Sequence, residues 1–249
     1  MALFSGASRM SNVMNCPMSG QRVMNRVATL LCGLALMTPA FGQEVGKERQ
    51  RLVEVRTDLG TLVVTLYNET PVHRDNFLKL ANDGAYDSLL FHRIIPQLMV
   101  QSGDPGSRTA GPQTVLGQGG PGYSLPAEVV PGLIHKKGAL AAVRADDHTG
   151  PDERTSGSQF YIVLGKPFQP NELDLLAQRS ARMGNPVTYT EEQKQLYATE
   201  GGAPHLDGGY TVFGEVVDGL EVLDALAAQA CDASDRPLKD IRMFIRVRP

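Results

Sequence analysis

An arginine among apolar residues is the first feature of this sequence that could carry chemistry. Arg93 lies in the segment FHRIIP, residues 91–96, whose apolar neighbours are typical of a strand. Burying a guanidinium is costly unless the group is paired with an acid or used in a reaction. A structural ion pair is one interpretation of Arg93, and a functional group at the edge of a binding site is the other.

Two short segments each present an amide side chain beside a large apolar one. Met99 and Gln101 are two residues apart, as are Gln159 and Tyr161, so each pair lies on one face of an extended strand. Together with Arg93 they predict an apolar pocket with a few polar groups and no titratable nucleophile. Such a pocket suits binding, or catalysis by electrostatics and shape alone.

Other patterns are weaker. The segment GQGGPG, residues 117–122, has the spacing of a dinucleotide-binding loop, but Pro121 prevents the helix that such a loop needs. The five histidines lack metal-ligand spacing, so we expect no metal and no cofactor. The acidic segment 146–153 lacks the pattern of a calcium loop, and the residues around Ser158 do not form a nucleophile elbow.

The elements that would position these residues are mostly short strands. Residues 52–67 contain two strand-like runs broken at 58–60, which predicts a hairpin, and residues 43–51 read as a polar linker. Helices are predicted to start at Thr70–Pro71 and at Asp218, each residue before the helix acting as its N-cap. Further strand-like runs lie at 89–95, 98–101, 139–143, 159–164, 211–217 and 241–247. This pattern favours a barrel or a sandwich.

Residues 166–204 interrupt the strand pattern with a polar, helical one. Asn171 and Thr190 are predicted N-caps, and Gly184 and Gly201 are predicted ends. These 39 residues are too few for a core of their own, so we interpret them as a two-helix insertion.

The first 42 residues differ from the rest of the chain. They contain three arginines, no acidic residue, and an apolar run at 27–37 that small residues follow. This pattern is typical of a secretory signal peptide, and the run is too short to span a bilayer comfortably. We therefore expect an exported, periplasmic protein without stable membrane insertion. Cys32 leaves a lipid anchor as the less favoured alternative.

Composition excludes several classes of protein. The 249 residues are 42% hydrophobic and 20% charged, with three cysteines and a net charge of −3, which excludes a disordered chain and a disulfide scaffold. Without residues 1–42, 21 basic residues face 27 acidic ones, a net charge of −6, and Cys231 is the remaining thiol. An acidic chain of this kind is not expected to bind nucleic acid.

Three segments together resemble a known family. They are FHRIIPQLMVQSGD at 91–104, GSQFYI at 157–162 and HLDGGYTVFG at 205–214. Each is similar to a signature segment of the cyclophilin-type peptidyl-prolyl cis/trans isomerases, and they occur in the family's order. The resemblance covers residues 52–165 and 204–247, so residues 52–249 are interpreted as one such domain.

The resemblance implies a mainly β fold: a closed eight-stranded antiparallel barrel capped by two helices, with the active groove on its outer surface. It implies that Arg93 is catalytic and that Gln101 and Gln159 bind the substrate backbone. Arg144 and Ala145 would make main-chain contacts. The proline pocket would be lined by Leu98, Met99, Tyr161 and Leu206, with His205 and Tyr210 at its rim.

Several positions depart from the family pattern. Leu98 and Tyr161 stand where Phe is common, and Arg144 stands where Asn is. His205 replaces a Trp that holds cyclosporin, and Tyr210 replaces a His. We therefore expect an active enzyme with altered substrate preference and weak cyclosporin binding.

The implied reaction needs no covalent step. Twisting an X–Pro bond leaves a lone pair on the prolyl nitrogen, and a fixed guanidinium would stabilise that twisted state. The partners would be proline-containing polypeptides, and the enzyme would act as a monomer on exported proteins. A non-catalytic binding module and a structural scaffold are the alternatives. The insertion at 166–204 would be either a surface pad or a lid that selects substrates.

Overall fold

The computed structural model describes residues 49–145 and 154–249. The predicted export signal, most of the linker at 43–51 and the acidic segment 146–153 lie outside these ranges. Residues from Gly46 to Pro249 form one compact unit. In the two described ranges, no helix has both the length and the apolar character needed to cross a membrane.

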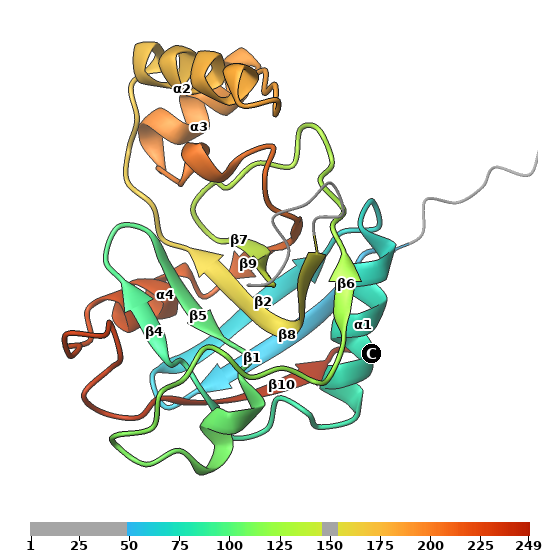
Figure 1. Ribbon diagram of the computed structural model, residues 1–249, viewed down its shortest axis with the longest axis vertical. Helices are drawn as coiled ribbons and strands as arrows, with labels where there is room; N and C mark the ends of the chain where they lie inside the picture. Colours follow the sequence, from blue (N-terminus) through green and yellow to red (C-terminus); the bar gives the residue numbers. More distant parts are fainter. Residues whose placement is uncertain (1–48, 146–153) are drawn as a thin grey trace, which may run out of the picture. The chain divides into compact units, whose positions relative to one another are not determined.

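Ten antiparallel strands in the described ranges form one curled sheet (Figure 1). Their order across the sheet is β3-β10-β1-β2-β9-β7-β8-β5-β4, and β6 pairs separately with β8. The strands are β1 Arg51–Thr57, β2 Gly60–Leu66, β3 Leu89–Leu90, β4 Arg93–Ile95, β5 Met99–Ser102, β6 Ser124–Pro126, β7 Ala139–Arg144, β8 Arg154–Val163, β9 Val212–Asp218 and β10 Arg242–Val247.

The two edge strands of the sheet, β3 and β4, belong to one stretch of chain. Between them, the Phe91 N–H donates to the Ile241 carbonyl at 3.0 Å and the His92 N–H donates to the Gln101 carbonyl at 3.1 Å. The segment 89–95 therefore pairs first with the β10 side and then with β5. The curled sheet thus has two strands more than the eight predicted in a closed barrel, because this segment contributes two short strands and β6 is an additional one.

The main core lies on the inner face of the curled sheet. Along β5, β7 and β8, alternate residues such as Val100, Leu140 and Ile162 are at most 1% exposed and belong to it. This alternation follows from the pleat of a strand, in which successive side chains point to opposite faces. Phe77 from the first helix and Leu223 from the last complete the core.

Two helices pack against the sheet, and they lie on opposite sides of it in Figure 1. They are α1, Pro71–Asn82, and α4, Leu220–Ala227. The Thr70 side chain makes no cap bond; the Glu128 carboxylate instead accepts from the N–H groups of Val72 and His73, at 3.1 and 2.9 Å. Thr70 is therefore the N-cap residue as predicted, but the side chain that accepts from the first N–H groups is that of Glu128.

The predicted cap of α4 is wrong. Asp218 ends β9, and the N-cap is Gly219, whose φ is 87°. A Cβ at Gly219 would lie 2.4 Å from the Thr61 carbonyl oxygen. The turn therefore requires a left-handed residue without a side chain, and this requirement outweighs the preference for an acidic cap.

The insertion forms two helices, α2, Pro170–Arg182, and α3, Glu191–Thr199. Thr190 caps α3 as predicted, whereas α2 is capped by Gln169 through a reciprocal bond with Glu172 rather than by Asn171. Two short 3-10 turns complete the described elements, η1 at Pro105–Thr109 and η2 at Pro204–Leu206. The insertion has a small apolar cluster of its own, centred on Leu173, Tyr189 and Tyr197.

Candidate active site

A second apolar cluster lies on the outer face of β5, β8, β7 and β9. We call this set of residues the outer pocket, because the family resemblance implies that a proline ring binds there. The register places Gln101 opposite Tyr161, Tyr161 opposite Ala141, and Ala141 opposite Val212. These residues alternate with the core residues, so the two clusters occupy the two faces of the same strands. The outer pocket comprises Met99, Ala139, Ala141, Tyr161, Val163, Ala203 and Val212, with Leu98, Val143 and Leu206 partly buried against it.

Four of the predicted proline-pocket residues are thus brought together. Met99 is 8% exposed and Tyr161 is 5% exposed, so these two side chains form the floor. Leu98 and Leu206 are only partly buried and form the walls. Burial raises the pKa of Tyr161 well above its usual value, so its hydroxyl stays protonated. That hydroxyl lies 3.0 Å from Nε2 of His135.

The two predicted amide side chains contact each other beside the outer pocket. The Gln101 Nε2 donates to the Gln159 Oε1 at 2.8 Å, and both side chains are buried. The Gln159 Nε2 donates to the carbonyl oxygens of Gly117 and Gly119, at 2.9 and 2.7 Å. Both N–H bonds of the Gln159 amide are therefore used within the protein, whereas among the described residues none donates to the Gln101 side-chain carbonyl, which can accept from a ligand.

The loop that holds Gln159 is itself held by a buried carboxylate. Asp104 is 2% exposed, and its Oδ2 accepts from the N–H groups of Gly117 and Gly119, at 2.6 and 3.2 Å. Its Oδ1 accepts from the Gly106 N–H at 2.8 Å. The glycine-rich loop leads into β6.

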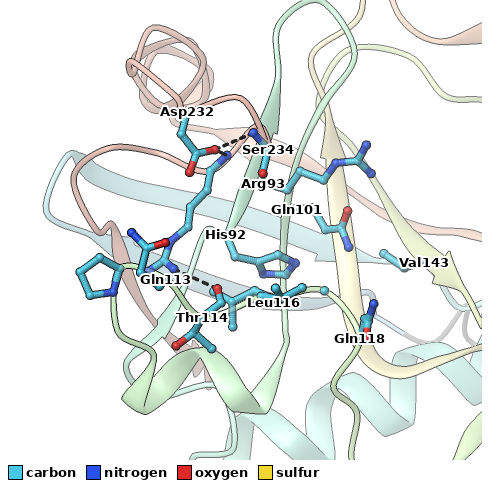
Figure 2. Close-up of a pocket in the computed structure, with 14 residues that line it drawn as sticks. His92, Arg93, Gln101, Gln113, Thr114, Leu116, Gln118, Val143, Asp232 and Ser234 are labelled. Carbon is cyan, nitrogen blue, oxygen red and sulfur yellow. Dashed lines mark hydrogen bonds between the residues drawn. The ribbon is translucent and has the colours of Figure 1, made fainter.

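Arg93 begins β4 directly opposite Gln101 on β5, and Figure 2 shows the two side chains next to each other. The Arg93 side chain is 46% exposed, so it lies at the edge of the apolar cluster rather than within it. Its Nε donates to the Asp235 Oδ2 at 3.4 Å. This contact is long, and the Arg93 guanidinium keeps its positive charge. In the described ranges its two Nη groups have no hydrogen-bond partner and are free to bind a ligand.

Arg93 and Gln101 also line a cavity of about 520 Å³, together with Val143, which packs against the outer pocket. His92 lies beneath this cavity and is 4% exposed (Figure 2). Neither ring nitrogen of His92 has a hydrogen-bond partner among the residues described. Burial lowers the pKa of His92, so the ring is neutral near pH 7 and does not oppose the charge of Arg93.

The remaining predicted residues are Arg144 and Ala145, expected to make main-chain contacts, and the rim residues His205 and Tyr210; the Tyr210 ring lies 6.4 Å from the Tyr161 ring. Arg144 donates from Nη2 to the Gly209 carbonyl at 2.7 Å, and its guanidinium lies 4.6 Å from the centre of the Tyr210 ring. The Ala145 N–H donates to the Arg154 carbonyl at 2.9 Å, so this amide is not available to a substrate. His205 is exposed on η2 beside Leu206.

Four residues that support the site were not singled out from the sequence: Asp104, His135, Asp207 and Asp235. Asp104 carries a local signal, because an aspartate two residues before a glycine often accepts from its N–H in a turn. His135 and Asp235 carry none, since their partners lie 72 and 142 residues away in the chain. In the part of the chain that the structure describes, no group of three or more His, Cys, Asp or Glu side chains could hold a metal ion.

Comparison with known proteins defines the class to which this fold and site belong. The family model for "Cyclophilin type peptidyl-prolyl cis-trans isomerase/CLD" matches residues 52–246. A crystal structure of a cyclophilin-type isomerase from Cryptosporidium parvum has a TM-score of 0.56 and 24% identity, covering 81% of this chain and 99% of that one. The same protein in the presence of the dipeptide Ala-Pro has a TM-score of 0.55 and 25% identity.

Bacterial relatives are more similar in sequence. A Staphylococcus aureus protein named as a peptidyl-prolyl cis-trans isomerase is 31% identical over 204 residues, which cover 82% of this chain and 93% of that protein. A Streptococcus pyogenes protein named as a bifunctional phosphatase/peptidyl-prolyl cis-trans isomerase is 37% identical over 194 residues. The match spans 76% of this chain but only 37% of that longer protein. The chain belongs to the cyclophilin-type peptidyl-prolyl cis-trans isomerase family, and its activity is isomerisation of peptidyl-prolyl bonds.

Proposed function

We propose that this isomerase binds the proline ring in the outer pocket and uses Arg93 to stabilise the twisted X–Pro bond. The observation that carries the proposal is the position of Arg93 at the edge of an apolar floor, with two Nη groups that no described residue engages and a fixed backbone. Met99 and Tyr161 supply apolar contact for the pyrrolidine ring. The site therefore combines one permanent charge with apolar contact, which suits a reaction without proton transfer.

The energetics fit this arrangement. Amide resonance gives the bond a rotational barrier of about 18–20 kcal/mol, and twisting localises a lone pair on the prolyl nitrogen. A hydrogen bond from a charged donor is worth roughly 1.5–3 kcal/mol, which corresponds to ~10–200-fold in rate. The remaining acceleration comes from holding the ring in the outer pocket while the preceding residue rotates.

Gln101 and Gln159 have different roles in this proposal. Gln101 directs its free carbonyl toward the substrate backbone, where it accepts from a peptide N–H. Gln159 holds the Gln101 amide in place, because its own N–H groups are bound to the glycine loop. Gln101 is thus the substrate-binding residue of the pair, and Gln159 is a positioning residue.

We also propose that the substrates are proline-containing segments of exported proteins and that the enzyme acts as a monomer. The support is the signal-like pattern of residues 1–42, with its basic start and apolar run. Fractionation of cells that express the full chain tests this point. Recovery of the protein with the periplasmic fraction, in a form shortened at its N-terminus, is the expected result, whereas an unshortened cytoplasmic protein would contradict it.

The activity proposal is tested with the Arg93→Ala variant of the full chain. We expect the proline-peptide isomerisation rate to fall by at least tenfold, while far-ultraviolet circular dichroism stays that of the wild type. Arg56→Ala is the matched control, because Arg56 is also on a strand and 58% exposed but lies outside the site. Wild-type activity in Arg93→Ala would refute the assignment of Arg93.

A further inference from the structure

A buried polar chain connects the floor of the outer pocket to the insertion. The Tyr161 hydroxyl lies 3.0 Å from His135 Nε2, and His135 Nδ1 lies 2.7 Å from Asp207 Oδ1. Asp207 Oδ2 accepts from the hydroxyls of Tyr189 and Tyr197, at 2.9 and 2.6 Å. All five side chains are at most 8% exposed. We call this set the tyrosine–aspartate–histidine chain.

The direction of each hydrogen bond follows from the partners. Four donors converge on the Asp207 carboxylate, because the His135 backbone N–H also donates to Oδ1 at 2.8 Å. A carboxylate only accepts, so His135 carries its proton on Nδ1 and offers Nε2 as an acceptor. Tyr161 then donates its hydroxyl to Nε2. The polar end of Tyr161 is directed away from the outer pocket, and only its ring faces a bound proline.

The members of the tyrosine–aspartate–histidine chain that lie farthest along it from Tyr161 belong to the insertion. Tyr197 lies on α3 and Tyr189 lies just before it, within residues 166–204. Burial raises the pKa of both phenols, which keeps the two hydroxyls protonated as donors to Asp207. Their rings pack edge to face at 5.7 Å, and Tyr197 is completely buried. The insertion is therefore connected to Tyr161 in the pocket floor through a set of buried, hydrogen-bonded side chains.

We propose that the insertion sets the position of the Tyr161 ring through Asp207 and His135, so that Tyr197, Asp207 and His135 are positioning residues for isomerisation. This inference rests on the proposed role of the outer pocket. It differs from both a surface pad and a lid, because it requires no movement over the substrate. Leu206 adjoins Asp207 in the sequence, so the same carboxylate also anchors one wall of the outer pocket.

The test removes single hydroxyls and keeps each ring. Tyr197→Phe takes one donor from Asp207, and we expect kcat/KM on proline peptides to fall by about three- to tenfold, the effect of one lost hydrogen bond. Tyr86→Phe is the matched control, because Tyr86 is 1% exposed, lies in the main core and does not belong to the tyrosine–aspartate–histidine chain. Its kcat/KM should stay within twofold of wild type.

A double variant separates positioning from stability. Tyr161→Phe and Tyr197→Phe interrupt the same set of hydrogen bonds, so the double variant should lose no more activity than the more affected single variant. Unchanged kcat/KM in Tyr197→Phe, or losses that multiply in the double variant, would overturn the inference. Should Tyr197→Phe fail to fold, Tyr189→Phe provides the same comparison.

Nuclear magnetic resonance of the imidazole nitrogens gives a readout that a purely structural role would not move. In the wild type we expect the Nδ1 of His135 to carry the proton that bonds Asp207 and Nε2 to accept from Tyr161, and Tyr197→Phe should shift the Nε2 resonance. A proton on Nε2 would contradict the inferred direction of the bonds. If wild-type activity and the loss in Arg93→Ala are as expected while these results fail, only the positioning inference is refuted.

Discussion

Asp104→Asn is the substitution whose effect can be worked out most fully from the structure. The change keeps the shape of the side chain but replaces one carboxylate oxygen with an amide group. Two N–H groups, from Gly117 and Gly119, donate to Oδ2 at 2.6 and 3.2 Å, and the Gly106 N–H donates to Oδ1. In either orientation, an amide nitrogen would face at least one backbone donor at hydrogen-bond distance. The variant therefore leaves buried N–H groups without an acceptor.

The magnitude follows from the number and kind of bonds lost. A hydrogen bond to a charged group is worth roughly 1.5–3 kcal/mol, and Asp104 is 2% exposed, so water cannot replace it. We expect the free energy of unfolding to fall by about 2–4 kcal/mol, because at least one buried N–H loses its acceptor and the remaining N–H groups then bond a neutral oxygen instead of a charged one. Since domains are typically stable by about 5–15 kcal/mol, the variant should remain folded at 25 °C.

The functional consequence passes through the glycine loop. Gly117 and Gly119 hold the Gln159 amide, which in turn holds Gln101. A loosened loop should therefore raise KM for proline peptides more than it lowers kcat, because the proposed role of Gln101 is to bind the substrate. The assays are urea unfolding followed by circular dichroism and a protease-coupled isomerisation assay.

Asp87→Asn is the control for the same chemical change at the surface. Asp87 pairs with Arg246, but these side chains are 35% and 46% exposed, so the pair is solvated. A solvated pair is worth at most about 1 kcal/mol, so its loss should be small. If Asp104→Asn were as stable as Asp87→Asn and bound peptide as well as the wild type, the reasoning about the loop would be refuted.

Two further predictions concern stability. Gly103→Ala should strongly lower the free energy of unfolding, because φ is +94° and the new Cβ would lie 2.2 Å from the Ser158 carbonyl oxygen. The control is Gly184→Ala, where φ is +90° but nothing lies within 4 Å of the new Cβ, so urea unfolding should show a much smaller loss of stability. Equal losses of stability in the two variants would argue against the packing explanation. Burial lowers the pKa of His73 and His92, so the unfolded state binds more protons below their usual pKa. The free energy of unfolding should therefore fall as the pH drops from 7.5 to about 5.5, near and below the ordinary histidine pKa of about 6.5, and a rise would contradict this account.

The strand pattern and the site face were both predictable from the sequence, for one physical reason. The pleat of a strand puts residues two apart on one face, so spacing alone pairs Met99 with Gln101, and Gln159 with Tyr161. The family resemblance names the same face, and the register confirms that Gln101 lies opposite Tyr161.

What the sequence could not supply were contacts between residues distant in the chain. The Gln159 amide looked like a substrate donor, but the loop at 117–119 uses its N–H groups. The apolar neighbours of Arg93 left a structural ion pair and a functional group at a site edge as alternatives, and only the fold shows that β4 is an edge strand and that the side chain is half exposed. These outcomes depend on which strand lies at the edge of the sheet and on which loop folds back onto the Gln159 side chain.

Local signals for the helix ends also competed with long-range ones. Asp218 has the residue type and spacing of an N-cap, but it pairs with Val63 on β2 and stays in the sheet. Thr70 is in the right place, but Glu128, more than fifty residues further along the chain, reaches the first N–H groups of α1 instead. A carboxylate from elsewhere in the fold can thus replace the hydroxyl that the local sequence predicts as the cap.

The segment 89–95, which pairs with β10 at one end and with β5 at the other, has a consequence for folding kinetics. Arg93 lies in the second half of this segment, and the first half pairs with residues about 150 positions later in the sequence. Contacts of such long range form slowly, because the intervening chain must first be ordered. Isomerase activity should therefore be among the last properties to return during refolding, after most of the strands have already paired.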